Sequence, residues 1–251
     1  MSEAIIKLID VWKRLGSQEV LKGLDLDVPR GETLVIMGRS GAGKSVILKH
    51  MIGLMSPDKG NVFFDGQSLE RLSRAELNEV HKRFGMLFQS SALFDSMTVG
   101  ENVSIGLRHH TNLTEEEIRG VVAKKLEAVG LPGLENKMPS ELSGGMRKRV
   151  GLARAISMDP EVILYDEPTT GLDPIMADAI NELILETRNH VGATSVVVTH
   201  DVNSALKVGT LISLLDDGRI IFTGKPQELK ETDNPYVKQF LEGRATGPLK
   251  G

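Results

Sequence analysis

The residues whose types and spacing best suit chemistry form the stretch GRSGAGKSV, from Gly38 to Val46. Its first eight residues follow G-x-x-x-x-G-K-[ST], after a short apolar run and before a segment of helical spacing, so a mere glycine turn is the weaker alternative. Glycines let main-chain N–H groups curl around phosphate oxygens, and a helix N-terminus adds positive potential. In this pattern the lysine reaches the β- and γ-phosphates and the hydroxyl binds Mg²⁺. The predicted nucleotide-binding residues are Gly38, Arg39, Ser40, Gly41, Ala42, Gly43, Lys44, Ser45 and Val46.

An acidic pair ends a second apolar run, VILYDE. Because an aspartate at such a strand end can hold Mg²⁺ through water, Asp166 is a predicted metal residue. Glu167 follows at the carboxyl edge of the sheet, where ligands bind in open α/β folds, and it can polarise an attacking water as a general base. Alone, Glu167 would be better explained as a solvated acid; beside a phosphate loop, we expect it to be catalytic.

Two further polar residues end buried runs: Gln89 ends GMLFQ and His200 ends SVVVTH. Parallel strands bring their carboxyl ends to one sheet edge, so we predict that His200 lies near the γ-phosphate and that Gln89 supplies an oxygen to Mg²⁺ or to the water. A lone strand-end histidine is more often structural, and a lone glutamine carries little information. Both predictions therefore depend on the topology.

A second anion-binding helix start occurs in ELSGGMRKRV. Glycine in a first helical turn costs stability unless something must approach closely, so Ser143, Gly144 and Gly145 predict an anion at this N-terminus. One nucleotide already has its cradle, and we expect that a helix projecting sideways from the core does not turn back onto it. These residues are therefore predicted to bind the γ-phosphate of a second copy, docked head to tail about a two-fold axis. The alternative is that Ser143 only caps the helix; Arg147–Arg149 is assigned to a solvated face or to subunit contacts.

The elements that position these residues follow from local patterns. Alternating apolar and polar residues predict antiparallel strands at 4–11 and 19–28, joined near Gly16. Continuous apolar runs predict buried strands in ETLVIMG, RFGMLFQ, EVILYDE and ATSVVVTHD. Asp-Gly pairs at 65–66 and 217–218 predict hairpin turns. Helices are predicted from 44 to about 54, from 114 to 129 with a Thr114–Glu117 capping box, and after Asp173 with Pro174 in first position.

This order of elements predicts the fold class. We expect an α/β fold of the P-loop NTPase type, with a mostly parallel sheet core, an antiparallel β subdomain and an inserted helical subdomain. The chain, residues 1–251, is expected to be a single domain. Its core spans about 1–90 and 159–240, the helical subdomain about 91–158, and the C-terminal tail 241–251 looks poorly ordered.

Composition limits the function classes. A net charge of −4 and a sequence pI of about 5.9 give no bulk electrostatic case for nucleic acid as a partner. The absence of cysteine excludes disulfides and thiolate metal sites and fits a reducing cytosol. No basic n-region followed by an apolar stretch opens the sequence, and no run of about 18 apolar residues occurs, so we expect neither a signal peptide nor a membrane span. His109 and His110 lack companions at metal spacing and are expected to be solvated.

The combined motifs resemble those of the ATPase subunits of ABC transporters. LSGGM lies between the phosphate loop and LYDEPTTGLDP, and Gln89 and His200 end the apolar runs where this family has a glutamine and a histidine. The resemblance covers essentially the whole chain. It implies ATP and Mg²⁺ as cofactors, a homodimer that ATP closes, Leu142–Met146 as a signature motif acting in trans, and Gly171–Asp173 as a D-loop crossing the interface. The implied catalytic residues are Glu167, His200, Lys44 and Gln89, the implied metal residues are Ser45, Gln89 and Asp166, and Asp173 joins the nucleotide-binding residues.

A finer resemblance is to the ATPases of MCE-linked lipid transporters, the maintenance-of-lipid-asymmetry (Mla) type. It is carried by GRSGAGKSVILKHMIGL, MLFQSSALFDSMTVGENV, KMPSELSGGMRKRVGLARAI and QFLEGRATGP. It implies an ATP-hydrolysing subunit that powers phospholipid transport for outer-membrane lipid asymmetry, on the cytoplasmic face of a bacterial inner membrane and peripheral to it through a permease. The implied partners are a second copy, an MlaE-like transmembrane permease and an MCE-domain (MlaD-like) protein. Whether a small STAS-domain (MlaB-like) subunit also binds is left open.

One position departs from the family pattern. ABC ATPases commonly stack adenine on an aromatic residue near the first strand-turn, and by spacing that position is Leu15. Trp12 either substitutes for it or packs as a strand residue. Arg39 occupies a free position of the phosphate loop and either adds charge near the nucleotide or faces solvent. The triphosphate is therefore expected to carry most of the affinity.

An apolar stretch follows Gln89. The apolar residues Ala92, Leu93, Phe94 and Met97, just after Gln89, either receive a cytoplasmic helix of the permease or form a local core. The alternatives in function are an ABC importer or exporter ATPase for another substrate and a non-transport ABC-type ATPase. A phosphotransferase or GTPase leaves the signature helix without a role. The lipid and the direction of transport are not encoded in this chain.

Overall fold

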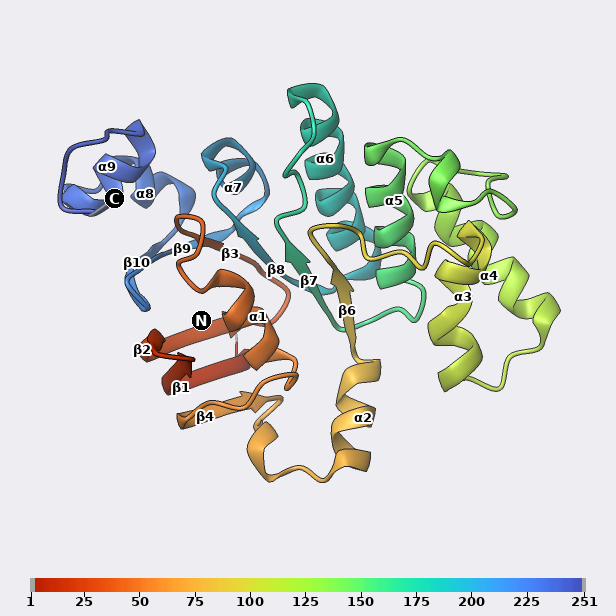
Figure 1. Cartoon of the computed structure of the whole chain (residues 1–251), viewed down its shortest axis with the longest axis horizontal. Helices are drawn as coiled ribbons and strands as arrows, with labels where there is room; N and C mark the ends of the chain where they lie inside the picture. Colours follow the sequence, from red (N-terminus) through yellow and green to blue (C-terminus); the bar gives the residue numbers. More distant parts are fainter. Residues whose placement is uncertain (1–2, 250–251) are drawn as a thin grey trace. The chain divides into compact units, whose positions relative to one another are not determined.

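The computed structural model describes residues 3–249, except for the side chains of residues 190 and 191. The chain divides into two compact units (Figure 1). Unit 1 comprises Met1–Leu77 and Val196–Gly251, and unit 2 comprises Asn78–Ser195. The predicted α/β class is confirmed, with an antiparallel sheet in unit 1, parallel strand pairs in both units and a group of helices in unit 2.

The antiparallel sheet of unit 1 has the strand order β2-β1-β4-β5. Its strands are β1 (Ala4–Leu15), β2 (Gln18–Pro29), β4 (Lys59–Phe64) and β5 (Gln67–Ser68). The predicted strands are confirmed and run a few residues further than the alternation indicated. Between β4 and β5, Asp65 and Gly66 take φ values of 51° and 77°, the left-handed pair that a two-residue hairpin turn requires.

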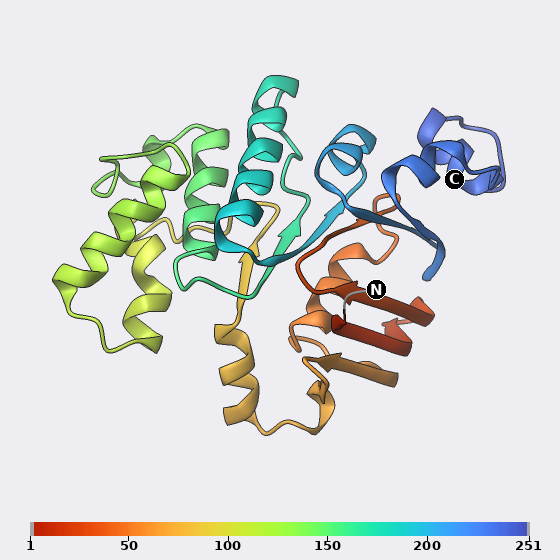
Figure 2. The same cartoon turned by 180° about the vertical axis from the view of Figure 1, so that it is seen from behind.

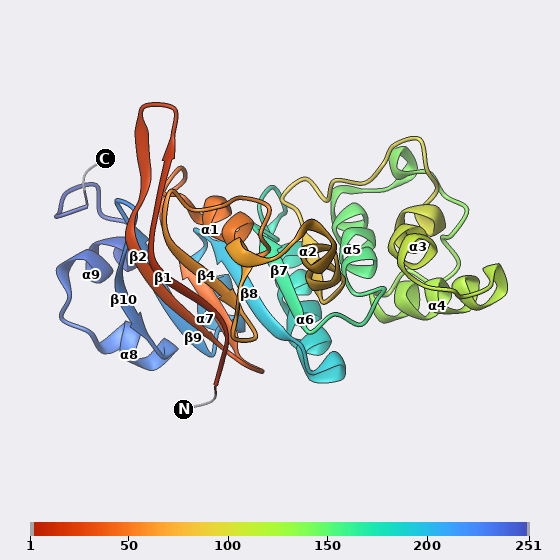
Figure 3. The same ribbon diagram turned by 90° about the horizontal axis from the view of Figure 1, so that it is seen from below.

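Unit 1 also holds the strands that flank the phosphate loop. These are β3 (Thr33–Met37), buried at every position, β9 (Leu211–Asp216) and β10 (Arg219–Gly224). β3 pairs with β9 in parallel, and β9 turns into antiparallel β10 through Asp217-Gly218, as predicted. The β1–β2 hairpin lies alongside β10 (Figure 3), where the Lys22 N–H donates to the Gly218 carbonyl. The remaining elements of unit 1 are α1 (Lys44–Met51), η1 (Leu69–Arg71), α7 (Val202–Val208), α8 (Pro226–Glu231) and α9 (Pro235–Glu242).

Two elements cross the boundary between the units. The helix α2 (Arg74–Lys82) enters unit 2, and the strand β8 (Thr194–Thr199) enters unit 1. Every residue of β8 is buried, as its continuous apolar run predicted.

Unit 2 combines two parallel strands, β6 (Phe84–Leu87) and β7 (Val162–Asp166), with a group of helices (Figure 2). The helical elements that lie wholly within it are α3 (Val99–His110), α4 (Glu115–Ala128), η2 (Pro139–Glu141), α5 (Gly144–Ala155) and α6 (Pro174–Val191). Side chains start these helices: Thr114 and Glu117 form the predicted capping box, and the Asp173 carboxylate accepts from the first turn of α6 with Pro174 in first position. The α5 helix packs on α3, α4 and β6. A Cβ added to Gly85 would overlap the Ala155 carbonyl, so β6 approaches α5 at backbone distance.

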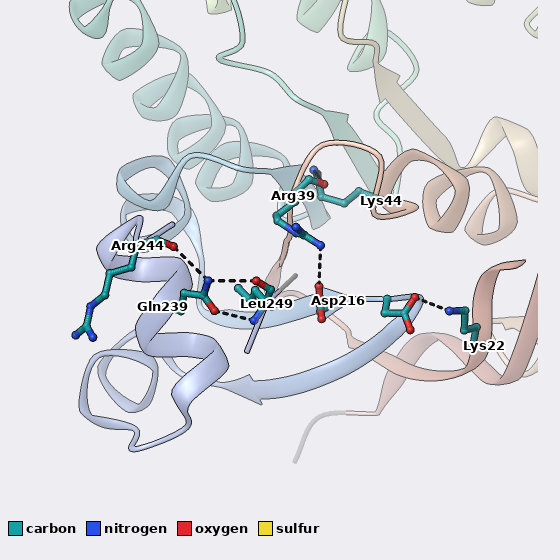
Figure 4. Close-up of polar contacts among 8 residues, drawn as sticks. Lys22, Arg39, Lys44, Asp216, Gln239, Arg244 and Leu249 are labelled. Carbon is teal, nitrogen blue, oxygen red and sulfur yellow. Dashed lines mark hydrogen bonds and ion pairs between the residues drawn. The ribbon is translucent and has the colours of Figure 1, made fainter. Parts of the chain in front are cut away.

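The C-terminal segment differs from the expectation of poor order. The amide of Gln239, 7 % exposed, accepts from the Leu249 N–H at 2.7 Å and donates to the Arg244 and Leu249 carbonyls (Figure 4). Leu249 itself is buried. The tail therefore folds back on α9 as far as this residue, through contacts that its polar composition did not indicate. The limits of the core, helical subdomain and tail given above stay predictions.

Candidate active site

The phosphate loop of unit 1 joins β3 to α1. Gly41 and Gly43 take φ values of 80° and 103°, which L side chains rarely adopt. A Cβ added to Gly38 would lie 2.7 Å from the Leu215 carbonyl oxygen, and one on Gly43 would lie 2.9 Å from Val20 Cγ1. The glycines that the motif requires therefore allow both the curl of the loop and its close packing on β2 and β9.

Lys44 closes this loop. Its Nζ is 2.8 Å from the Gly38 carbonyl and 3.0 Å from the Arg39 carbonyl, and the residue is 5 % exposed. The ammonium is thus buried across the curled loop, where a phosphate oxygen would be a better partner than an uncharged carbonyl. Ser45 and Val46 follow in the first turn of α1 and are both half-buried. This arrangement fits a polyphosphate at the N-terminus of α1.

The outer side of the loop carries Arg39, Ser40 and Ala42. The Arg39 guanidinium is 3.6 Å from an Asp216 carboxylate oxygen, next to the β9–β10 turn that Lys22 also holds (Figure 4). A cavity of about 520 Å³ adjoins the loop here, and Tyr236 and Pro248 lie among its lining residues. Arg39 is therefore partly exposed to solvent and paired with an acid beside the phosphate loop. Whether it adds charge near the nucleotide stays a prediction.

The other candidates in unit 1 lie at strand ends. His200 follows β8 and is exposed. The turn after it is fixed, because the Asp201 N–H donates to Thr199 Oγ1 and the Asp201 carboxylate caps α7. Leu15 is 42 % exposed at the end of β1, whereas Trp12 donates its indole N–H to Asp10 at 2.7 Å. Whether Trp12 stacks on adenine stays a prediction.

In unit 2, β7 ends at Asp166 and Glu167 follows immediately. Glu167 is 8 % exposed and takes a φ of 48°, and its carboxylate accepts from the Thr170 hydroxyl at 3.1 Å. A glutamate held in the left-handed region is strained, and such strain persists only where the surroundings over-determine the backbone. The turn after β7 therefore points to function, since nothing in ordinary strand termination requires this conformation.

The expectation of a solvated basic run is wrong at Lys148. This residue is 5 % exposed, and its ammonium donates to the Gln89 carbonyl and, at 3.3 Å, to the Glu167 carbonyl. The structure thereby brings the main chains of Gln89 and Glu167 together, while the Gln89 side chain is exposed. Helical spacing could have revealed this: Lys148 lies three residues after buried Gly145 and four before buried Leu152, on one helix face.

The loop after Gln89 is held from within unit 2. The buried Asn102 amide bonds the Phe94 N–H and carbonyl and the Met97 carbonyl at 2.8–3.1 Å. The Arg154 guanidinium donates to the Ser91 and Ala92 carbonyls. Phe94 remains 50 % exposed on this fixed loop.

The two glycines of the signature stretch, Gly144 and Gly145, both lie in the first turn of α5 but have different surroundings. Ser143 caps the helix by accepting from the Met146 N–H at 3.3 Å. A Cβ on Gly145 would overlap the terminal methyl of Met176, whereas one on Gly144 would meet nothing closer than 4.0 Å. A side chain on Gly145 would therefore displace the flexible end of Met176, whereas Gly144, which is exposed, has no internal reason to be glycine.

The segment Gly171–Asp173 leads into α6. The Asp173 carboxylate accepts from the N–H groups of Ile175 and Met176 at 3.0 Å each. Ile175 is 82 % exposed in the same turn.

The predicted metal residues are Ser45, Gln89 and Asp166, and their role stays a prediction. No group of three or more histidines, aspartates or glutamates among residues 3–249 could hold a metal ion. Ser45 belongs to unit 1, and Gln89 and Asp166 belong to unit 2. Their oxygens are the ligands that Mg²⁺ prefers, and phosphate oxygens and water complete such a shell. The donor set thus fits Mg²⁺ that arrives with a nucleotide. His109 and His110 are exposed, as expected.

A phosphate loop between a buried parallel strand and a helix, together with a strained glutamate after a second parallel strand, defines a P-loop ATPase. The comparison with protein families gives the finer class: the chain belongs to the ABC transporter family, whose profile matches residues 21–170.

Relatives of known name match nearly the whole chain. The intermembrane phospholipid transport system ATP-binding protein MlaF is 43% identical in Haemophilus influenzae, over 100% of this chain and 95% of the relative, and 43% identical in Escherichia coli K12, over 99% and 94%. The probable ribonucleotide transport ATP-binding protein mkl of Mycobacterium leprae is 44% identical over 97% of this chain and 70% of the relative.

Solved structures show the same fold. A dimeric ATP-binding cassette in a post-hydrolysis state, bound to ADP and Pi, has a TM-score of 0.81 at 34% identity, covering 88% of this chain and 98% of that one. The protein cbiO1 from Clostridium perfringens, part of the ABC transporter complex cbiONQ, has a TM-score of 0.83 at 30% identity, covering 96% of each chain. The predicted family, fold class and ATPase activity are confirmed, whereas the roles of individual site residues stay predictions.

Proposed function

We propose that this chain is the ATP-hydrolysing subunit of a bacterial inner-membrane transporter that moves phospholipid between the inner membrane and the outer envelope. The observation that carries the proposal is the extent of its similarity to two MlaF proteins, 99–100% of this chain and 94–95% of theirs. The similarity therefore includes the loop after Gln89 and the C-terminal segment, which lie outside the nucleotide motifs.

Two copies share each catalytic centre in this proposal. One copy supplies the phosphate loop with Lys44 and Ser45, and Glu167, Gln89 and His200 act on the same nucleotide. The other copy supplies Ser143, Gly144 and Gly145 at the N-terminus of α5, which is suited to the γ-phosphate. Support comes from the exposed Gly144, from exposed Ile175 beside Gly171–Asp173, and from the dimeric state of a related cassette. Asp173, whose carboxylate caps α6, contributes by shaping this surface.

Hydrolysis then proceeds by in-line attack on the γ-phosphorus. The Glu167 carboxylate orients the attacking water and takes up its proton as the new P–O bond forms and the bond to the β,γ-bridging oxygen breaks, giving ADP and phosphate. Lys44 and His200 donate toward the γ-phosphoryl oxygens. Mg²⁺, when bound to Ser45, Gln89 and Asp166, neutralises phosphate charge.

The loop after Gln89 is the proposed docking surface for an MlaE-like permease. Phe94 is exposed, and Asn102 and Arg154 fix the main chain that presents it. A helix end inserted beside Phe94 would therefore transmit its position to Gln89. Among residues 3–249 no helix is long and apolar enough to cross a bilayer, so in this proposal the permease holds the chain at the inner membrane.

A further proposed partner is an MCE-domain (MlaD-like) protein, with a STAS-domain (MlaB-like) subunit as an optional member.

The similarity to mkl supports a second candidate substrate class, ribonucleotides. Purification of the full-length chain from native membranes distinguishes the two. An MCE-domain protein and bound phospholipid are expected; a permease without either, or one whose lipid-free complex transports ribonucleotides, would contradict the phospholipid assignment.

A further inference from the structure

A buried cation links the two strand ends of unit 2. In β6 and β7 the Cα partners include Leu87 and Tyr165. Gln89 and Glu167 each lie two residues beyond that pair, and the ammonium of Lys148 donates to the main-chain carbonyl oxygens of both. Lys148 therefore links the two segments that follow β6 and β7, at the point where these parallel strands end.

The burial of this charge has a cost that its surroundings offset. Desolvation lowers the pKa of Lys148, while the charges of Asp166 and Glu167 act in the opposite direction. Two carbonyl acceptors and two nearby carboxylates are the partners that a buried ammonium needs. A leucine or methionine would fill the same space without that cost, so packing alone does not account for a lysine here.

The bond to Glu167 acts on a strained residue. Glu167 adopts a φ of 48°, and Lys148 binds the carbonyl of that same residue. Besides Lys148, the Thr170 N–H donates to this carbonyl at 3.2 Å, and the Thr170 hydroxyl holds the carboxylate. Main-chain and side-chain contacts together thus fix the direction in which the Glu167 carboxylate points.

We propose that Lys148 is a positioning residue for ATP hydrolysis, which holds Glu167 and Gln89 in register through their main-chain carbonyls. This rests on the proposed catalytic role of Glu167. Because Lys148 stands on the helix that Ser143 begins, it also ties the signature helix of one copy to the catalytic carboxylate of the same copy. A displacement of α5 on dimer closure would therefore move Glu167 and Gln89 together.

The test compares Lys148→Met, which removes the ammonium, with Lys148→Arg, which keeps a cation and its donors. Lys124→Met is the matched control, since Lys124 is an exposed helical lysine of the same unit. In the full chain purified with its membrane partners, Lys148→Met should lower kcat by about 10- to 100-fold, the scale expected for a misplaced catalytic group. KM for ATP should change less than about twofold, because the phosphate loop is untouched, and Lys148→Arg should recover most of the rate.

A readout independent of turnover accompanies the kinetics. In the nucleotide-free protein, amide hydrogen exchange at 89–91 and 167–170 should accelerate in Lys148→Met but not in Lys148→Arg or Lys124→Met. If Lys148→Met does not fold, the milder Lys148→Gln is measured in its place. An unchanged kcat, parallel losses in kcat and ATP affinity, or no rescue by arginine would overturn the proposal. A ribonucleotide substrate would refute the phospholipid assignment without affecting this result.

Discussion

Gly145 and Met176 lie so close that any side chain on Gly145 would displace the methionine's terminal methyl, whereas the neighbouring Gly144 has open space around it. The two glycines of one motif thus have different surroundings. The first faces solvent in the single chain, and the second faces α6. Substitution of each should separate folding from assembly.

Gly144→Ala should leave the melting temperature of the isolated chain unchanged or slightly raised, because alanine is the better helix former. It should nevertheless abolish ATP-dependent dimer formation, since in the proposed dimer the added methyl would lie where the γ-phosphate of the partner's nucleotide approaches. Size-exclusion chromatography with Mg-ATP and differential scanning calorimetry measure both properties. A Gly144→Ala variant that dimerises and hydrolyses ATP normally would show that this N-terminus does not bind an anion closely.

Glu167→Gln should trap a nucleotide-bound dimer and reduce turnover to background. The amide keeps the shape and the Thr170 contact but takes up no proton, so binding persists while the chemical step stops. Multi-turnover phosphate release and retention of labelled ATP by the dimer provide the measurements. Hydrolysis at the wild-type rate would refute the general-base assignment.

Asn102→Ala should destabilise the fold by about 3 kcal/mol, because a fully buried amide with several main-chain partners is lost. By contrast, Phe94→Ala should leave stability within about 0.5 kcal/mol, since this side chain is half exposed. Phe94→Ala should instead reduce co-purification of the permease. Denaturant unfolding and pull-down from membranes separate the two outcomes; a stable Phe94→Ala chain that retains the permease would exclude this loop as the docking surface.

Stability should fall as the pH drops below the ordinary histidine range, through His50. Burial lowers the pKa of this side chain, which bonds the Val46 carbonyl and is fully buried. Its stabilising contribution, that of a neutral imidazole, is complete above the unfolded pKa of about 6.5 and is lost as the pH falls toward the lowered folded value. Unfolding free energies at pH 7.5 and 5.5 should therefore differ less in His50→Phe than in wild type. The exposed His109→Gln serves as the control and should keep the full pH dependence.

Local chemistry made much of this fold predictable from the sequence. The Thr114–Glu117 capping box, Pro174 after Asp173 and the two Asp-Gly turns each act over a few residues, and the structure has all of them where predicted. The phosphate loop was equally predictable, because the left-handed backbone that its curl requires at Gly41 and Gly43 favours glycine at those positions.

Features that depend on distant contacts were missed. The sequence assigned Lys148, with its two basic neighbours, to a solvated face or to subunit contacts, since its acceptors, Gln89 and Glu167, lie beyond the ends of two strands and outside its own helix. The C-terminal tail looked disordered because its order depends on Gln239 and Leu249, which composition does not reveal. In both cases a buried polar side chain found partners that only the tertiary structure brings near.

The most direct measurement of a catalytic centre shared between two copies is complementation between two inactive variants. Lys44→Ala lacks the phosphate-loop ammonium, and Ser143→Arg blocks the N-terminus of α5. When equal amounts are mixed, half the dimers should be mixed and each should contain one intact centre, so about a quarter of wild-type ATPase activity should return. If each chain instead completed its own centre, both variants would carry a defective site in every dimer, and the mixture would remain inactive.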